Sequence, residues 1–120
     1  MKPKILVVDD DGDLRELYRL ELEDEGYEVD LAADAFAAME ILQHAHYDVL
    51  ILDLRMPGMT GIDFLQKAIA RNRQQSVILN TSYSYYRQNY LAWLASAYVV
   101  KSHSTAELKQ AVRNALAAKS

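Results

Sequence analysis

The stretch YDVLILDLRMPGMTG (residues 47–61) decides how the chain folds. Four apolar residues, Val49 to Leu52, stand in a row before Asp53, and a Pro-Gly pair follows at 57–58. An apolar run of this length, bounded by turn residues, is typical of a strand covered on both faces in a parallel sheet. A carboxylate at the end of such a strand is costly to bury unless other charged groups meet it. We therefore expect Asp53 to belong to a charged cluster.

Strands and helices alternate along the whole chain. The hydrophobic pattern and the turn residues predict strands at 4–8, 27–31, 49–52, 76–80 and 98–100, and helices at 12–25, 35–44, 61–71, 86–94 and 105–118. This order, without a linker or a repeat, is typical of a single domain in which a parallel sheet carries helices on both faces.

Local signals place the ends and faces of several helices. Asp34 is expected to cap the second helix, and Gly26 to end the first in a left-handed conformation. Ser104 and Glu107 match the capping-box pattern, which predicts that Ser104 caps the last helix. In the first helix one face is expected to be buried, namely Leu14, Leu17, Tyr18 and Leu22.

Composition and charge exclude several classes of protein. The 120 residues are 51% apolar and 25% charged, as in an ordinary globular domain. The chain has no cysteine, which excludes disulfides and is compatible with a cytoplasmic location. No segment has the ~20 apolar residues that span a membrane, and no region is basic enough to favour nucleic-acid binding. Residues 1–63 carry a net charge of −11, which favours a cation site there, and residues 64–120 carry +7.

Polar side chains follow four of the five predicted strands, namely Asp9 and Asp10, Asp53, Thr81 and Lys101. The carboxyl ends of parallel strands share one edge of the sheet, where ligands bind. Three carboxylates repel one another unless a cation joins them, and oxygen ligands alone favour Mg²⁺, with Mn²⁺ and Ca²⁺ as alternatives. A carboxylate beside a metal, an ammonium and a hydroxyl suits phosphoryl transfer, with Asp53 as the acceptor. Each residue alone has an ordinary reading as a cap, a turn former or a solvated lysine.

Five segments carry a family resemblance, namely ILVVDDD (5–11), EDEGYEV (23–29), VLILDLRMPGMTG (49–61), VILNTS (77–82) and YVVK (98–101). In this order and spacing the chain resembles, along its whole length, the receiver domain of two-component response regulators. The resemblance implies an α/β, flavodoxin-like three-layer sandwich, with a five-stranded parallel sheet in the order 2-1-3-4-5 and five helices on its two faces. Residues 1–120 would form one receiver domain without an effector domain.

The resemblance also implies a metal site and a phosphoacceptor. Asp53 would be the residue that is phosphorylated. Asp10 and Asp53 would bind Mg²⁺ directly, Asp9 through water, and the backbone carbonyl of Arg55 would complete the protein ligands. The acceptor would take its phosphoryl group from a histidine kinase or a histidine phosphotransfer protein. Apart from its own phosphorylation and dephosphorylation at Asp53, such a domain is not an enzyme.

The resemblance further implies a conformational switch that responds to phosphorylation. Thr81 would be the switch hydroxyl, Lys101 the phosphoryl contact and Tyr98 the aromatic residue that turns inward. The face made by the 86–94 helix, the fifth strand and the last helix would then control a downstream protein or effector domain. Five of the eight tyrosines lie between residues 83 and 98 with Trp93, and this face is a candidate for homodimerisation.

Three positions depart from the family pattern. Ser102 stands in place of the usual proline, so the preceding peptide bond is either trans or a costly cis form. Leu94 stands where glycine is usual, and Asn80 at a usually apolar strand position, where it needs hydrogen-bond partners if buried. These departures leave open an interaction module of receiver fold that no longer switches by phosphorylation. A second alternative, a Mg²⁺-dependent aspartyl-phosphate hydrolase, would want an aspartate where Arg55 stands.

Overall fold

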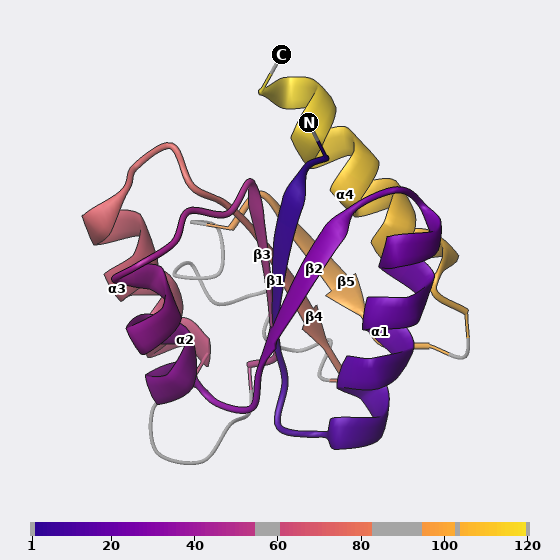
Figure 1. The fold of residues 1–120 in the computed structure, drawn as a ribbon, viewed down its shortest axis with the longest axis horizontal. Helices are drawn as coiled ribbons and strands as arrows, with labels where there is room; N and C mark the ends of the chain where they lie inside the picture. The colour runs from indigo at the N-terminus through magenta and orange to yellow at the C-terminus, as the bar shows by residue number, and fades with distance from the viewer. Residues whose placement is uncertain (1, 55–60, 83–94, 103, 120) are drawn as a thin grey trace.

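The structure, a computed structural model, describes residues 2–54, 61–82, 95–102 and 104–119. Its five strands form one parallel sheet in the order β2-β1-β3-β4-β5, as expected (Figure 1). The elements of the described residues are β1 (Lys4–Val8), α1 (Gly12–Asp24), β2 (Glu28–Ala32), α2 (Ala35–Leu42), β3 (Val49–Leu52), α3 (Gly61–Arg71), β4 (Ser76–Thr81), β5 (Ala97–Val100) and α4 (Ala106–Ala118). The helix predicted for residues 86–94 lies outside the described residues.

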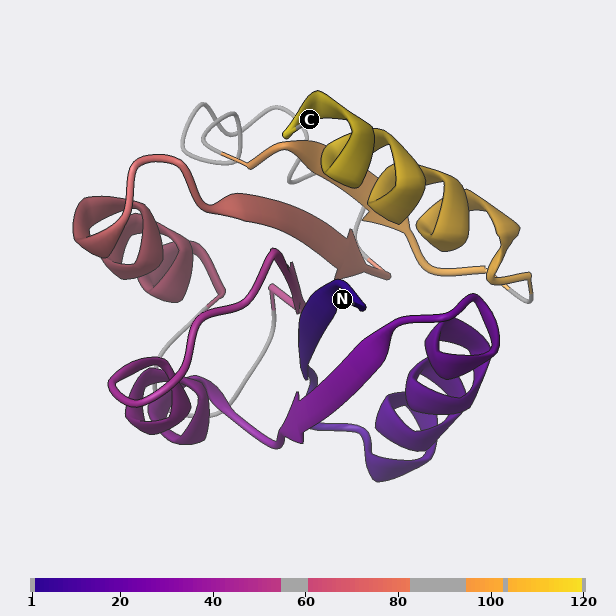
Figure 2. The ribbon, with the colours of Figure 1, turned by 45° about the horizontal axis from the view of Figure 1, so that its top comes forward.

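The four described helices cover the two faces of the sheet in pairs. Helices α1 and α4 lie on one face, and α2 and α3 on the other (Figure 2). Each face buries its own apolar core, one of which includes Phe64 of α3 and the other Leu22 of α1, both fully buried. The three-layer sandwich predicted from the alternation of elements is therefore confirmed. No helix among the described residues is long and apolar enough to cross a membrane.

Strand β3 lies in the middle of this sheet and is buried on both faces, and its apolar run predicted this burial. Its four residues are at most 1% exposed. Val49 and Ile51 belong to the core under α1 and α4, while Leu50 and Leu52 belong to the core under α2 and α3. This alternation is the pleat of a strand buried on both faces, and it fixes which way the residues beyond the strand point.

Two of the predicted helix ends are confirmed. Asp34 is the N-cap of α2, and its side chain accepts a hydrogen bond from the backbone N–H of Ala37 at 2.8 Å. Gly26, just after α1, has a φ of +94°, a region in which a side chain is strained. Its N–H bonds to the carbonyl of Glu23 at 2.9 Å, which closes the last turn.

Two local predictions were wrong. Helix α4 begins one residue later than its capping-box pattern indicated, with Thr105 rather than Ser104 as N-cap. The hydroxyl of Ser104 accepts a hydrogen bond from the N–H of Ala106 at 3.1 Å, so it closes a turn before the helix. Leu17 is 42% exposed, because α1 packs on the sheet through Tyr18 and the residues in line with it, and Leu17 lies at the margin of that stripe.

Candidate functional site

Three carboxylates meet at the carboxyl edge of the sheet. Asp9 follows β1 and Asp53 follows β3, and the two strands are neighbours, so that the N–H of Asp53 bonds to the carbonyl of Val8 at 3.0 Å. Asp9 and Asp53 are buried, at 2% and 8% exposure, whereas Asp10 is exposed. One oxygen from each of the three carboxylates lies within 4.8 Å of the others. An all-oxygen set with one face open to solvent fits a hard divalent cation such as Mg²⁺.

Lys101 joins the two buried carboxylates. Its Nζ lies 2.7 Å from Oδ2 of Asp9 and 3.2 Å from Oδ2 of Asp53. Its backbone N–H bonds to the carbonyl of Thr81 at 2.7 Å, so the end of β5 is tied to the end of β4. There is no cis peptide bond in the described part of the chain, which includes the bond to Ser102. Lys101 thus reaches the site without the proline that usually follows it.

Burial and charge act in opposite directions on this cluster. Desolvation raises the pKa of Asp9 above its ordinary value, although the hydrogen bonds from Lys101 and from the backbone of Asp11 act to lower it. Desolvation acts to lower the pKa of Lys101, but its hydrogen bond to Asp9 and the charges of Asp9 and Asp53 outweigh this, and the pKa is raised. Lys101 is therefore a permanent cation at neutral pH, and it partly neutralises the two acids.

The loop between β1 and α1 holds Asp9 in place. The N–H of Asp11 donates to Oδ1 of Asp9 at 2.9 Å, and Asp11 itself caps α1. Arg15, from the first turns of α1, donates from its guanidinium to the backbone carbonyl of Asp9 at 2.7 Å. The sequence interpretation missed Arg15. A basic residue four positions after a helix cap, among so many acids, was the available signal.

Gly61 is a second residue that the sequence interpretation missed. Its N–H bonds to the carbonyl of Leu54 at 3.0 Å, so α3 starts against the end of β3. A Cβ atom at this position would lie 2.4 Å from the backbone oxygen of Asp53, closer than real Cβ contacts come. Only glycine allows this approach, and the main chain of Asp53 is thereby enclosed between β1 and α3.

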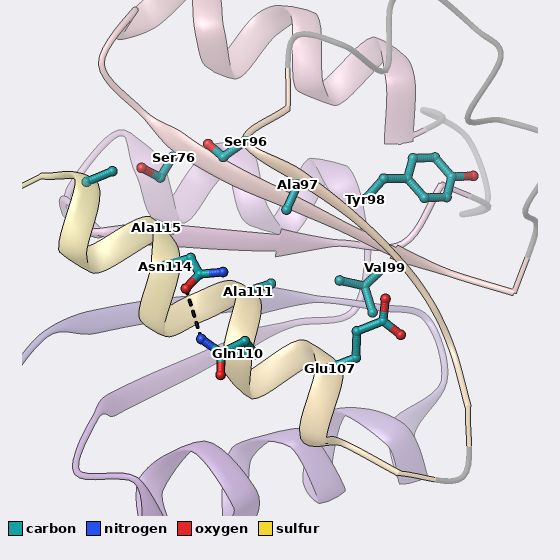
Figure 3. Close-up of a pocket in the computed structure, with 11 residues that line it drawn as sticks. Ser76, Ser96, Ala97, Tyr98, Val99, Glu107, Gln110, Ala111, Asn114 and Ala115 are labelled. Atoms are coloured by element: carbon teal, nitrogen blue, oxygen red, sulfur yellow. Dashed lines mark hydrogen bonds between the residues drawn. The ribbon is translucent and has the colours of Figure 1, made fainter.

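Thr81 and Tyr98 lie on the face of the sheet that α2 and α3 cover. Thr81 ends β4 and is fully buried. Tyr98, which pairs with Leu79 in the sheet, packs in part against the core under α2 and α3. Figure 3 shows its ring pointing away from α4. Strand alternation puts Thr81 on the same face as Leu79, and hence as Tyr98, as a coupled pair requires.

One predicted metal ligand remains a prediction. Arg55, whose backbone carbonyl was the remaining predicted metal ligand, lies outside the described residues.

A groove of about 370 Å³ lies between β5 and α4, on the predicted output face (Figure 3). Small side chains such as Ala97 and Ala111 form its floor, and polar ones such as Gln110 and Asn114, joined by a hydrogen bond of 2.9 Å, form its rim.

Comparison with known proteins agrees with this geometry. The family model of the response regulator receiver domain matches residues 5–113. The response regulator ArlR of Staphylococcus saprophyticus is 33% identical over 112 residues, which cover 92% of this chain and 50% of that protein. Sporulation initiation phosphotransferase F of Bacillus subtilis is 35% identical over 83 residues, 69% of this chain and 67% of that one. The chain thus spans about half to two thirds of these relatives' lengths.

Solved structures show the same fold. The response regulator TrrA of Thermotoga maritima, in complex with Mg²⁺-BeF, superposes with a TM-score of 0.92 at 41% identity, covering 96% of this chain and 99% of that one. TrrA in complex with the histidine kinase ThkA gives a TM-score of 0.90, with coverage of 97% and 99%. With a family model that matches nearly its whole length and a sheet of the expected order, this chain belongs to the response regulator receiver domain family.

Proposed function

We propose that this domain accepts a phosphoryl group on Asp53 from a histidine kinase or a histidine phosphotransfer protein, in a Mg²⁺-dependent step. The observation that carries the proposal is the placement of Lys101 between Asp9 and Asp53. A lysine in this position can leave a carboxylate oxygen for a phosphoryl oxygen without a large movement. The nearby set of three carboxylates supports the cation requirement.

The chemistry follows from the groups around Asp53. One Asp53 oxygen attacks the phosphorus, the bond between phosphorus and the donor nitrogen breaks, and the electron pair goes to the imidazole. Lys101 stabilises the charge on the transferred oxygens, as phosphoryl transfer requires. Asp9, Asp10, Asp53 and the Arg55 carbonyl would hold Mg²⁺, which when bound adds positive charge beside the same oxygens. Mn²⁺ would serve the same role.

The response to phosphorylation is part of the same proposal. Thr81 at the end of β4 and Tyr98 in β5 share a face of the sheet, where a hydroxyl drawn toward a phosphoryl group would leave room for an aromatic ring. A charged group that contacts one arrangement better than the other shifts the population toward it. We propose that the shift alters the face formed by β5 and α4, including the groove between them, and so controls a downstream protein or effector domain.

Relatives support the partners named here. TrrA, which is 41% identical, has been crystallised with Mg²⁺-BeF and, separately, with a histidine kinase. A cytoplasmic location, and the absence of any catalysis beyond phosphorylation and dephosphorylation at Asp53, belong to the proposal. So does homodimerisation through the tyrosine-rich face, most of which lies outside the described residues.

The test is to incubate the domain with Mg²⁺ and acetyl phosphate and to measure its intact mass. We expect a gain of one phosphoryl group in the wild type and none in Asp53→Asn. Asp24→Asn, which changes an exposed aspartate at the end of α1, is the matched control and should gain the group normally. A wild type that binds Mg²⁺ but gains no mass would favour the non-switching interaction module. Steady release of phosphate from an ester would favour the hydrolase.

A further inference from the structure

Asn80 is a buried polar side chain near the carboxyl end of β4. It is 3% exposed, and its Nδ2 atom has no hydrogen-bond partner among the described residues. The residues before it in β4, from Val77 to Leu79, are apolar and fully buried. A buried amide without a partner destabilises a fold, so each such group calls for an explanation.

The pleat of the sheet places Asn80 beside the phosphoacceptor. Ile78 belongs to the core under α1 and α4, and Asn80, two residues on, points to the same face. Asp53 also points there, because it follows Ile51 by two residues. Leu52 pairs with Leu79 across β3 and β4, so the next residue on each strand is Asp53 and Asn80. The amide and the acceptor carboxylate are neighbours on one face.

Lys101 must pass over Asn80 to make its ion pairs. It follows β5, while Asp53 follows β3, and β4 lies between these two strands. Neighbouring strands lie about 4.8 Å apart, so a lysine whose Nζ is 3.2 Å from Asp53 spans the end of β4. Val99 faces α1 and α4, so Lys101, two residues on, shares the face of Asn80. Asn80 therefore lies beneath the lysine stem.

Tyr18 of α1 packs against the same face of the sheet as Asn80. It is 5% exposed and packs in the core under α1 and α4. Burial raises the pKa of its hydroxyl, and the side chain of Asn80 and the charge of Lys101 act to lower it. The Asn80 amide thus lies near this hydroxyl without meeting hydrogen-bond geometry. Among the described residues, Tyr18 lies near this amide, and the pleat of the sheet puts Lys101 and Asp53 on the same face.

We propose that Asn80 is a positioning residue whose amide donor is used in the phosphorylated state. The inference rests on the proposed function. When one Asp53 oxygen bonds to phosphorus and the donor's P–N bond breaks, Lys101 turns to the phosphoryl oxygens. The other Asp53 oxygen, now a carbonyl, loses its charged donor, and the amide of Asn80 beside it takes that place. A donor that is unsatisfied in one state and satisfied in the other biases the equilibrium toward the second.

Three single variants test this inference. Asn80→Val removes the amide, Asn80→Thr keeps a hydroxyl donor in the shape of valine, and Ile78→Val trims an apolar neighbour on the same face of β4. Each is unfolded by heat without ligand and with Mg²⁺ and beryllofluoride, a phosphoryl mimic, and the affinity for beryllofluoride is measured. Unfolding without ligand shows directly that each variant folds.

Asn80→Val is expected to stabilise the protein without ligand but to weaken its binding of beryllofluoride. Asn80→Val should unfold at a higher temperature than the wild type without ligand, because an unsatisfied amide is gone. It should nevertheless bind beryllofluoride about 3- to 10-fold more weakly, the share of one hydrogen bond. Asn80→Thr should recover part of that affinity. Ile78→Val should lower the unfolding temperature with and without ligand alike.

The outcomes separate this inference from the proposed function. Equal affinity of wild type and Asn80→Val for beryllofluoride, or equal loss in the Val and Thr variants, overturns the role of Asn80 alone. A wild type that binds beryllofluoride but gains no phosphoryl group from acetyl phosphate overturns the proposed function and leaves the comparison of variants readable. A wild type that binds no beryllofluoride overturns both.

Discussion

Replacement of Lys101 by methionine removes the cation from the site while keeping a stem of similar length. The ammonium lies 2.7 Å from Asp9 and 3.2 Å from Asp53, and the three side chains are 12%, 3% and 10% exposed. At an effective dielectric constant of about 20, these two attractions are about 6 and 5 kcal/mol before the cost of desolvation is subtracted. Removal of one member of a buried ion pair costs about 3–5 kcal/mol, since it leaves the opposite charge uncompensated.

Urea unfolding at pH 7 measures this effect. In EDTA we expect Lys101→Met to lose about 3–5 kcal/mol of unfolding free energy, out of the 5–15 kcal/mol typical of a domain. In saturating Mg²⁺ the loss should be smaller, because a cation among the carboxylates takes over part of the neutralisation. The difference between the two conditions is the informative quantity, since a packing defect would not depend on Mg²⁺.

A matched lysine elsewhere provides the control. Lys109 lies 2.9 Å from Glu21, a distance close to those at the site, but both side chains of this pair between α4 and α1 are partly exposed. Lys109→Met should therefore change stability little, and equally with and without Mg²⁺. The reasoning fails if Lys101→Met unfolds like the wild type in EDTA. It also fails if Mg²⁺ stabilises the wild type and Lys101→Met by the same amount.

Three further predictions concern single positions. Gly61→Ala should cost on the order of 1–3 kcal/mol in urea unfolding, because its Cβ would press on the backbone of Asp53, whereas Gly12→Ala, whose Cβ would be 3.4 Å from the nearest side chain, should be tolerated. Asp34→Ala should cost about 1 kcal/mol in the same assay through loss of the α2 cap; an unchanged midpoint would contradict that role. The hydrogen bond from Lys109 lowers the pKa of Glu21 below its ordinary 4.5, so this pair stabilises the fold above pH 4.5 and ceases to do so as the pH falls through the lowered value. An NMR titration of the Glu21 carboxyl group should show its pKa rising in Lys109→Met, and an unmoved titration would refute the pairing.

The core of the site was predictable from strand ends alone. Asp9, Asp53 and Lys101 each follow a short apolar run, and parallel strands bring such positions to one edge of the sheet. Neither the ion pairs nor their lengths were needed for that prediction. The order of the strands, in contrast, was predicted only from the family resemblance, because alternation of strands and helices is compatible with several orders.

Other parts of the site depend on distances that no local pattern encodes. Arg15 bonds to a backbone carbonyl, an acceptor present at every residue, so its partner is set by how α1 lies against β1. The need for glycine at position 61 comes from the approach of α3 to β3. The N-cap of α4 is Thr105 rather than the predicted Ser104, because a pattern four residues long fixes the start of a helix only within about one or two residues.

Because of the close contact of Gly61 with Asp53, the two sides of Asp53 are held differently. On the side of β1 and α3, the main chain of Asp53 is held by a hydrogen bond to Val8 and by a helix that starts against it. On the side of β4 and β5, the carboxylate of Asp53 contacts the ammonium of Lys101, at the end of a flexible side chain. On the proposed function, a phosphoryl group on Asp53 would therefore displace the lysine more easily than the backbone of Asp53. On the same proposal, the side of the domain from which the response leaves is set by the side on which the backbone of Asp53 is held.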